Sequence, residues 1–235
     1  MKLKITGVLV ALIVLVGSAV AFAQGGASTQ KTAPAAKPPA AGAYDKALLT
    51  PAALNAKAPE TYDVKFSTTV GDFVIHVTRA WAPLGADRFY NLVKHHFYDN
   101  VGFYRAIPGF MAQFGIGAIP EVDRVWNHSD FKDDPVRHSN TRGTITFATA
   151  GANTRTTQLF INFVNNAGLD PQGFAPFGEV TSGMDIVDKI NTSYQNLDPQ
   201  KISDGGKAYL EKNYPNLTFI KTATLMDAAP ATPKP

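Results

Sequence analysis

The stretch Phe103-Tyr104-Arg105-Ala106-Ile107-Pro108-Gly109-Phe110-Met111-Ala112-Gln113-Phe114-Gly115 decides how the rest of the chain is interpreted. It places Arg105 among large apolar side chains, with Gln113 further along. The pair Pro108-Gly109 is typical of a turn, so two adjoining strands are predicted. Side chains alternate along a strand, so Met111 and Gln113 should share a face. Residue chemistry alone leaves two interpretations open: a guanidinium and an amide beside an apolar binding surface, or a buried hairpin with one snorkelling arginine.

Composition excludes several classes of chemistry. The chain has 235 residues and no cysteine, which excludes disulfides, thiolate nucleophiles and cysteine metal sites. Its formal charge is +3, but residues 1–43 contain four lysines and no acid, so the rest carries −1. The basic balance therefore gives no support for nucleic-acid binding by the folded part.

The N-terminal residues 1–23 are predicted to be a secretory signal peptide. Lys2 and Lys4 precede an apolar run, and Ala21-Phe22-Ala23 provides a small-x-small cleavage pattern. An uncleaved membrane anchor is the alternative, but the apolar run is near the lower length limit for crossing a bilayer. We therefore expect cleavage after Ala23, a periplasmic or secreted location, and no stable membrane insertion afterwards. A lipoprotein anchor is excluded because no cysteine follows.

The remaining segments are predicted as follows. Residues 24–43 form a disordered Ala/Pro-rich linker, because they cannot bury enough apolar surface to order themselves. Residues 44–60 are an N-terminal extension, either a short helical or irregular segment packed on the domain edge or more linker. The domain spans 61–226, and 227–235 is a disordered tail.

Hydrophobic periodicity predicts the elements inside the domain. Alternating residues indicate strands, listed in chain order as 63–68, 72–78, 144–148, 158–164, 177–180 and 217–225. Pro83 begins a helix with one apolar stripe. Asp185 is expected to cap a short helix, and 207–213 are expected to form a further, C-terminal one. The segment 116–140 is predicted to be irregular, with Trp126 as a loop anchor.

The opening stretch resembles the cyclophilin signature F-H-R-x-I-P-G-F-M-x-Q-G-G, from which it departs at Tyr104 and Phe114. Further matches follow in the family's order, at 143–161 and 169–187. The resemblance implies a mainly β fold: a closed eight-stranded antiparallel barrel capped by two helices, with a site in a surface groove. The C-terminal helix is an addition to that pattern.

The resemblance also implies prolyl cis–trans isomerisation, whose barrier of about 18–20 kcal/mol comes from amide resonance. A guanidinium aimed at the proline nitrogen would stabilise the twisted amide more than the planar one. On the family's pattern, Arg105 and Gln113 are the catalytic residues, and Gln113 bonds the substrate backbone. The substrate-binding residues carried over are Phe110, Met111, Ala148, Thr149, Gln158, Phe160, Leu169 and Phe174. Gly168 stands where cyclophilins that bind cyclosporin tightly have a tryptophan.

The expected partners are proline-containing polypeptides, with the chain acting as a monomer during folding of exported proteins. No cofactor, metal or nucleic acid is expected; adjacent residues such as His95 and His96 point apart on a helix and cannot readily chelate one ion. Two alternatives to an enzyme are kept. One is a cyclophilin-like chaperone that binds peptides with little turnover. The other is a barrel that carries an apolar small molecule, which would need a hollow interior.

Overall fold

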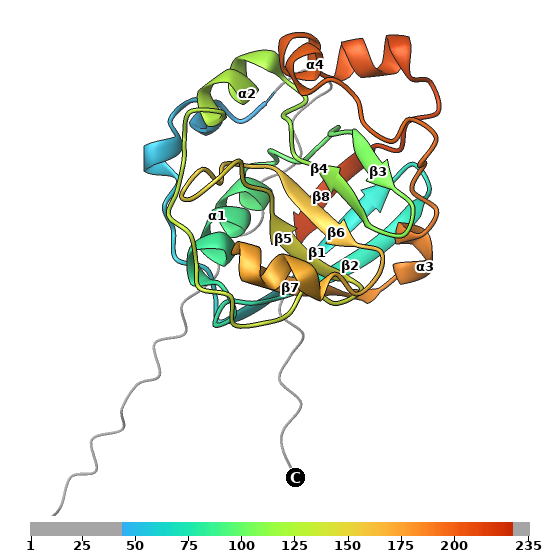
Figure 1. Cartoon of the computed structure of the whole chain (residues 1–235). Coiled ribbons are helices and arrows are strands. Elements are labelled where there is room, and N and C mark those ends of the chain that lie inside the picture. Colours follow the sequence, from blue (N-terminus) through green and yellow to red (C-terminus); the bar gives the residue numbers. More distant parts are fainter. Residues whose placement is uncertain (1–43, 228–235) are drawn as a thin grey trace, which may run out of the picture. The chain divides into compact units, whose positions relative to one another are not determined.

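The computed structural model describes residues 44–227. The predicted signal peptide and the linker lie outside this range, as does almost all of the predicted tail. Within it, the dominant feature is one antiparallel sheet of eight strands in the order β3-β4-β6-β5-β7-β2-β1-β8 (Figure 1). The strands are β1 (Thr61–Thr68), β2 (Gly71–Thr78), β3 (Arg105–Ile107), β4 (Met111–Phe114), β5 (Thr144–Phe147), β6 (Leu159–Asn162), β7 (Pro176–Ser182) and β8 (Ile220–Leu225).

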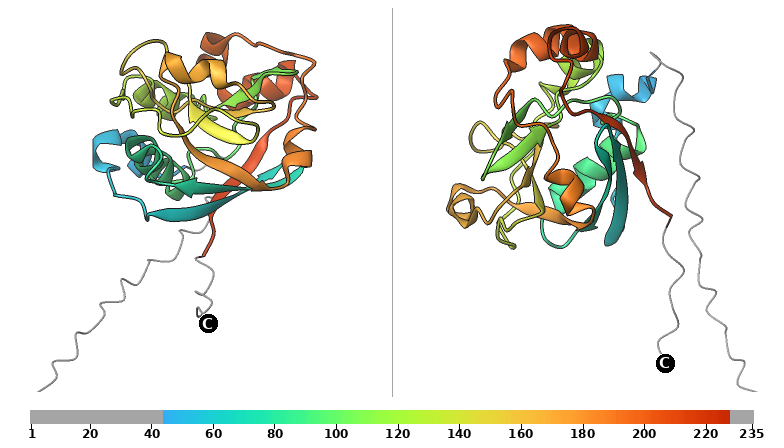
Figure 2. Two further views of the ribbon diagram at one scale, coloured as in Figure 1. Left: turned by 60° about the horizontal axis from the view of Figure 1, so that its bottom comes forward. Right: turned by 90° about the vertical axis from the view of Figure 1, so that its right-hand side faces the viewer.

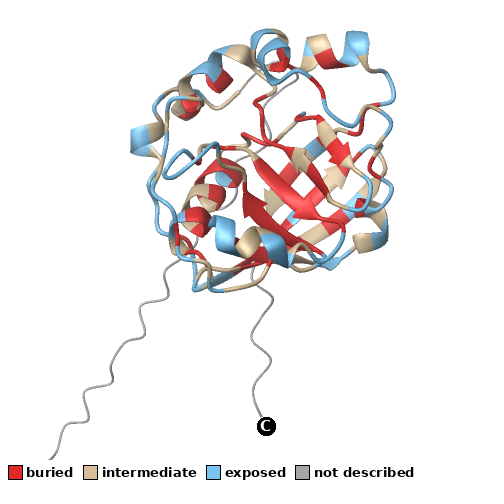
Figure 3. Ribbon diagram, viewed as in Figure 1, coloured by how far each residue is buried: buried red, intermediate tan, exposed pale blue. Residues whose placement is uncertain are grey.

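The first two strands show why the sequence pattern works. Along β1 and β2, buried and more exposed residues alternate, as the periodicity predicts. Phe66 pairs with Phe73 across the two strands, and their rings stack 5.0 Å apart. The buried face of this pair therefore joins the hydrophobic core, which Figure 3 shows as buried strands at the centre of the fold.

The expected closed barrel is wrong: β3 and β8 stand at opposite ends of the strand order, and the sheet is curled but open (Figure 2). The edges meet only at a bridge between Gly102 and Phe219, before the two strands proper. The reason is that another segment occupies the outer edge of β3. Leu197 N–H donates to the carbonyl of Tyr104, and Ala106 N–H donates to the carbonyl of Gln195, both at 3.0 Å.

Helix α1 (Pro83–Lys94) begins at the proline that the sequence indicated, and its buried side includes Ala86, Phe89 and Val93. Its N-terminal amides receive no side-chain cap from Ala82. Instead the carboxylate of Asp134 accepts hydrogen bonds from the first turn. Every helix in residues 44–227 is too short or too polar to span a lipid bilayer.

Three helices differ from the sequence predictions. Helix α2 (Pro120–Trp126) lies inside the segment predicted to be irregular, and it contains Trp126, which is fully buried. Helix α3 (Met184–Val187) has Gly183, not Asp185, at its N-cap position. Helix α4 (Pro199–Asn213) starts well before the helix expected over 207–213. Asp198 caps it, and it is kinked at Gly206. In α2 and α4 a proline at the first helical position starts the helix, where its missing N–H costs nothing.

Helices α2 and α4 lie side by side at the top of Figure 1, and side-chain hydrogen bonds join them there. The N-terminal extension packs on α2 as two short 3-10 turns, Lys46–Leu49 and Pro51–Ala53. Leu48 is buried, and the indole N–H of Trp126 donates to its carbonyl at 2.8 Å. The first of these turns is therefore joined to the folded part through Trp126.

Candidate functional site

The hairpin of β3 and β4 places Arg105 directly opposite Gln113. One guanidinium nitrogen of Arg105 donates to the Gln113 side-chain oxygen at 3.1 Å and lies 4.0 Å from the Met111 sulfur. Met111 is buried, whereas Arg105 and Gln113 are half-buried. The strand alternation expected from the sequence therefore holds, and an amide, a guanidinium and a thioether share one face.

A second polar contact continues from Gln113. Its side-chain nitrogen donates to the hydroxyl of Tyr104 and lies 3.2 Å from the side-chain oxygen of Gln158. The Tyr104 hydroxyl in turn donates to that Gln158 oxygen at 2.5 Å. Burial raises the pKa of the Tyr104 phenol well above its usual range, so the hydroxyl keeps its proton at ordinary pH.

Aromatic rings provide the apolar surface beside this polar pair. Phe160 on β6 pairs with Gln113 across the sheet and is itself buried. The ring of Phe174 meets that of Phe160 edge-on, with centroids 5.7 Å apart. Phe110 lies on the turn side, with the Arg105 guanidinium carbon 5.9 Å from its ring centre. The structure thus brings together Arg105 and Gln113 with four of the predicted apolar residues: Phe110, Met111, Phe160 and Phe174.

Leu169 lies on a separate 3-10 segment, Ala167–Gln172. Two side chains fasten this segment. Asn166 donates from its amide to the carbonyl of Phe110 at 2.9 Å, and Asp170 accepts from Ser139 and from the backbone of Asn140. Leu169 is half-buried, so it remains partly open to solvent.

Ala148 and Thr149 lie on the loop after β5. The N–H of Ala148 donates to the carbonyl of Gln158 at 2.9 Å, which ties the start of the loop to the strand bearing Phe160. The Thr149 hydroxyl bonds within its own loop, to Gly151 and Thr154. The loop is thus fastened to the site at its base, while its tip bonds to itself.

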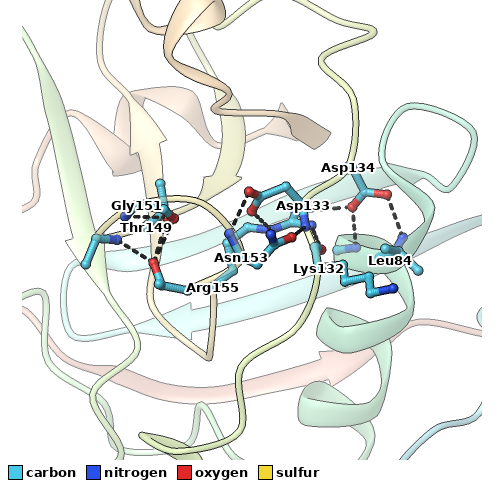
Figure 4. A network of polar contacts seen from close by, with 11 residues as sticks. Leu84, Lys132, Asp133, Asp134, Thr149, Gly151, Asn153 and Arg155 are labelled. Atoms are coloured by element: carbon cyan, nitrogen blue, oxygen red, sulfur yellow. Dashed lines mark hydrogen bonds and ion pairs between the residues drawn. The ribbon is translucent and has the colours of Figure 1, made fainter.

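A network of charges holds the far side of this loop (Figure 4). Arg155 is buried and donates to the carboxylate of Asp134 at 3.1 Å and to the carbonyl of Lys132. Asp133 accepts from the backbone of Asn153 at 2.7 Å. Because Asp134 also accepts hydrogen bonds from the first turn of α1, the network connects the loop bearing Thr149 to that helix.

Two histidines of the described range pair with aspartates outside this site. His76 pairs with Asp63 on neighbouring strands, and His95 pairs with Asp45, at 2.7 and 2.6 Å. In the same part of the chain, no group of three or more His, Asp or Glu side chains is arranged to hold a metal ion.

Sequence reasoning assigned no role to Tyr104, Asn166 and Arg155, although all three touch the site or its supports. Tyr104 was visible as a departure from the cyclophilin pattern, and that difference was the available signal. Asn166 and Arg155 act through partners that lie far away in the sequence, so no local pattern marks them.

Comparison with known proteins gives a consistent result. A family model described as "Cyclophilin type peptidyl-prolyl cis-trans isomerase/CLD" matches residues 63–205. The peptidyl-prolyl cis-trans isomerase of Acinetobacter baylyi is 36% identical over 133 residues, which cover 54% of this chain and 70% of that protein. The peptidyl-prolyl cis-trans isomerase B of Escherichia coli is 37% identical over 136 residues, covering 54% and 82%.

Solved structures agree on the fold. A cyclophilin-type isomerase of Cryptosporidium parvum, solved in the presence of the dipeptide Ala-Pro, superposes with a TM-score of 0.53 at 19% identity. The alignment covers 71% of this chain and 99% of that one. At this identity the likeness shows the fold alone.

Proposed function

The chain belongs to the family of cyclophilin-type peptidyl-prolyl cis-trans isomerases, and from that premise we propose that Arg105 is its central catalytic group. It accelerates rotation about X-Pro bonds in polypeptides. The observation that carries this proposal is the pairing of Arg105 with Gln113, 3.1 Å apart on one face of the hairpin and beside an apolar surface.

The chemistry needs a donor placed at one atom. As the prolyl amide twists, conjugation is lost and the nitrogen gains a lone pair. A guanidinium has five N–H donors and no acceptor, so Arg105 can bond Gln113 and still present donors to that nitrogen. This interaction exists only when the amide is twisted, and it therefore lowers the barrier instead of merely strengthening binding.

The apolar residues take the other part of the substrate. A proline ring offers only hydrocarbon surface, which gains free energy when it leaves water. Met111, Phe160 and Phe174 provide such a surface next to Arg105, with Phe110 on the turn side. We assign Leu169, on the 3-10 segment Ala167–Gln172, to the same surface. We assign Gln113 to the substrate backbone, and Ala148, Thr149 and Gln158 to the wall and support of the groove.

No proton moves between enzyme and substrate in this mechanism. Bond rotation needs neither a general acid nor a general base. An arginine side chain stays protonated at all ordinary pH values, and the buried phenol of Tyr104 does the same at and below neutral pH.

The experiment is a protease-coupled assay with a proline peptide. Wild-type protein should isomerise the peptide catalytically, and the Arg105→Ala variant should be strongly impaired. A wild-type protein that binds the peptide without turnover would instead point to the chaperone alternative.

We also propose that the protein acts as a monomer outside the cytoplasm, on exported polypeptides. The support is the leader-like sequence of residues 1–23, with its lysines, apolar run and cleavage pattern. Mass spectrometry of protein from its native host should find an N-terminus at or near Gln24. A retained Met1 in the membrane fraction would contradict cleavage and support an anchor.

A further inference from the structure

The side chain of Tyr104 stands between the catalytic hairpin and the neighbouring strand. Its hydroxyl accepts from the amide of Gln113 and donates to the amide oxygen of Gln158 at 2.5 Å. Tyr104 is only 3% exposed, so this hydroxyl has little access to water. A buried hydroxyl with two protein partners constrains both of them.

The Arg105 guanidinium determines which atoms donate and which accept in the hydrogen bonds that join Arg105, Gln113, Tyr104 and Gln158. Arginine can only donate, so the Gln113 atom 3.1 Å from Arg105 must be its carbonyl oxygen. The NH2 group of Gln113 then faces Tyr104, whose single proton goes to Gln158. Rotating the Gln113 amide by half a turn would put its NH2 against the guanidinium and its oxygen near the oxygen of Gln158. Because the Tyr104 proton goes to Gln158, the hydroxyl offers Gln113 only a lone pair, and it thereby favours the Gln113 orientation whose oxygen receives Arg105.

The ring of Tyr104 is held by the segment that covers the edge of β3. It belongs to a second hydrophobic cluster, separate from the main core, whose other buried members are Ile116, Leu197, Ile202, Leu210 and Leu217. Backbone hydrogen bonds from the same segment reach Tyr104 and Ala106, the two neighbours of Arg105. The residues after α3 thus fix the backbone on both sides of Arg105. The hydrogen bond between Gln113 and the Tyr104 hydroxyl connects Gln113 to the same segment.

We propose that Tyr104 is a positioning residue for isomerisation: it orients the Gln113 amide toward Arg105 and connects both to the segment that includes α4. The inference rests on the roles proposed above for Arg105 and Gln113. Tyr104 acts through Gln113 and does not itself touch the substrate.

The test begins with Tyr104→Phe, which keeps the ring and removes only the hydroxyl. Without the hydroxyl, Gln113 keeps only Arg105 and Gln158 as partners and is held less firmly. We expect kcat/KM to fall about five- to tenfold, because a hydrogen bond of this kind contributes about 1 kcal/mol and 1.36 kcal/mol is a factor of ten. The loss should appear in kcat, with KM nearly unchanged, because the orientation matters most in the twisted state.

The matched control is Tyr62→Phe. The Tyr62 hydroxyl also donates to a buried acceptor, the carbonyl of Ala86 at 2.6 Å, but outside the site. This variant should lose similar thermal stability and keep kcat/KM within about twofold of wild type. Equal activity losses in both variants would mean that Tyr104 has a merely structural role, and would overturn the inference.

A double mutant separates the remaining outcomes. If Tyr104 acts through Gln113, then Tyr104→Phe should cause almost no further loss in a Gln113→Ala background. Independent, multiplying losses would overturn the positioning role while leaving the role of Gln113 intact. A Gln113→Ala protein with wild-type kcat/KM would overturn the role proposed for Gln113, and with it the inference. Wild-type activity of Tyr104→Phe would overturn the inference alone.

Discussion

Replacement of Asp134 by alanine should destabilise the protein far more than replacement of its neighbour Asp133. Asp134 is 4% exposed, and its buried ion-pair partner Arg155 is 3% exposed. One carboxylate oxygen of Asp134 accepts from Leu84 N–H at 3.0 Å, and the other accepts from Gly85 N–H at 2.8 Å and from Arg155. The side chain therefore both pairs a buried cation and caps the first turn of α1.

The magnitude follows from these two roles. Removing one partner of a buried ion pair costs about 3–5 kcal/mol, because the other charge stays buried. The lower end applies here, since Arg155 keeps Asp133 at 3.2 Å and the carbonyl of Lys132. Losing the cap adds about 1 kcal/mol. The expected total is about 4 kcal/mol, or about 8–16 °C in Tm for a domain of this size.

Thermal and urea denaturation followed by circular dichroism would measure the effect. Asp133→Ala is the control, because that carboxylate also pairs with Arg155, at 3.2 Å, but is about one-third exposed to solvent. We expect it to cost about 1 kcal/mol or less. If Asp134→Ala costs no more than Asp133→Ala, the network of Figure 4 does not hold the loop to α1, and the reasoning fails.

Three further predictions concern the site and its surroundings. The wild-type kcat/KM on a proline peptide should be nearly flat from about pH 6 to pH 8.5; a bell-shaped profile would indicate proton transfer. Gly168→Trp should leave Tm almost unchanged, because the position is exposed and no described residue beyond the adjoining chain lies within 4 Å of the added Cβ. The added indole should tighten cyclosporin binding measured by calorimetry; an unchanged affinity would contradict this. Burial raises the pKa of Asp123 in the folded state, so the folded protein binds this proton first. Wild type should therefore gain stability relative to Asp123→Asn as pH falls from neutral to about 4, and a constant difference in urea titrations would refute the assignment.

The hairpin was predictable because its signals are local. A turn pair predicts the reversal, and strand alternation predicts that Met111 and Gln113 share a face. The register that places Gln113 opposite Arg105 is seen only in the structure. The contributions of Phe160 and Leu169 needed the family resemblance, since they lie on elements distant in the sequence from the hairpin.

The parts that the sequence did not reveal depend on contacts between distant segments. The Tyr104 hydroxyl finds its acceptor on Gln158, and the edge of β3 is covered by a loop from beyond α3. That coverage is also why the closed-barrel expectation failed. The missed helix starts have a different cause: α2 and α4 begin at Pro120 and Pro199, and a proline at the first helical position favours a helix.

The central claim, that Arg105 acts on the twisted amide and not on ground-state binding, is tested most directly by exchange NMR on a proline peptide. One titration gives both the peptide Kd and the catalysed exchange rate for wild type and for Arg105→Ala, whose folding is checked by circular dichroism. The account predicts that exchange falls about 10²–10³-fold, the usual loss when a transition-state donor is removed, while Kd changes only a few-fold because the apolar surface remains. Wild-type exchange in Arg105→Ala, or a Kd weakened as much as the rate, would contradict it.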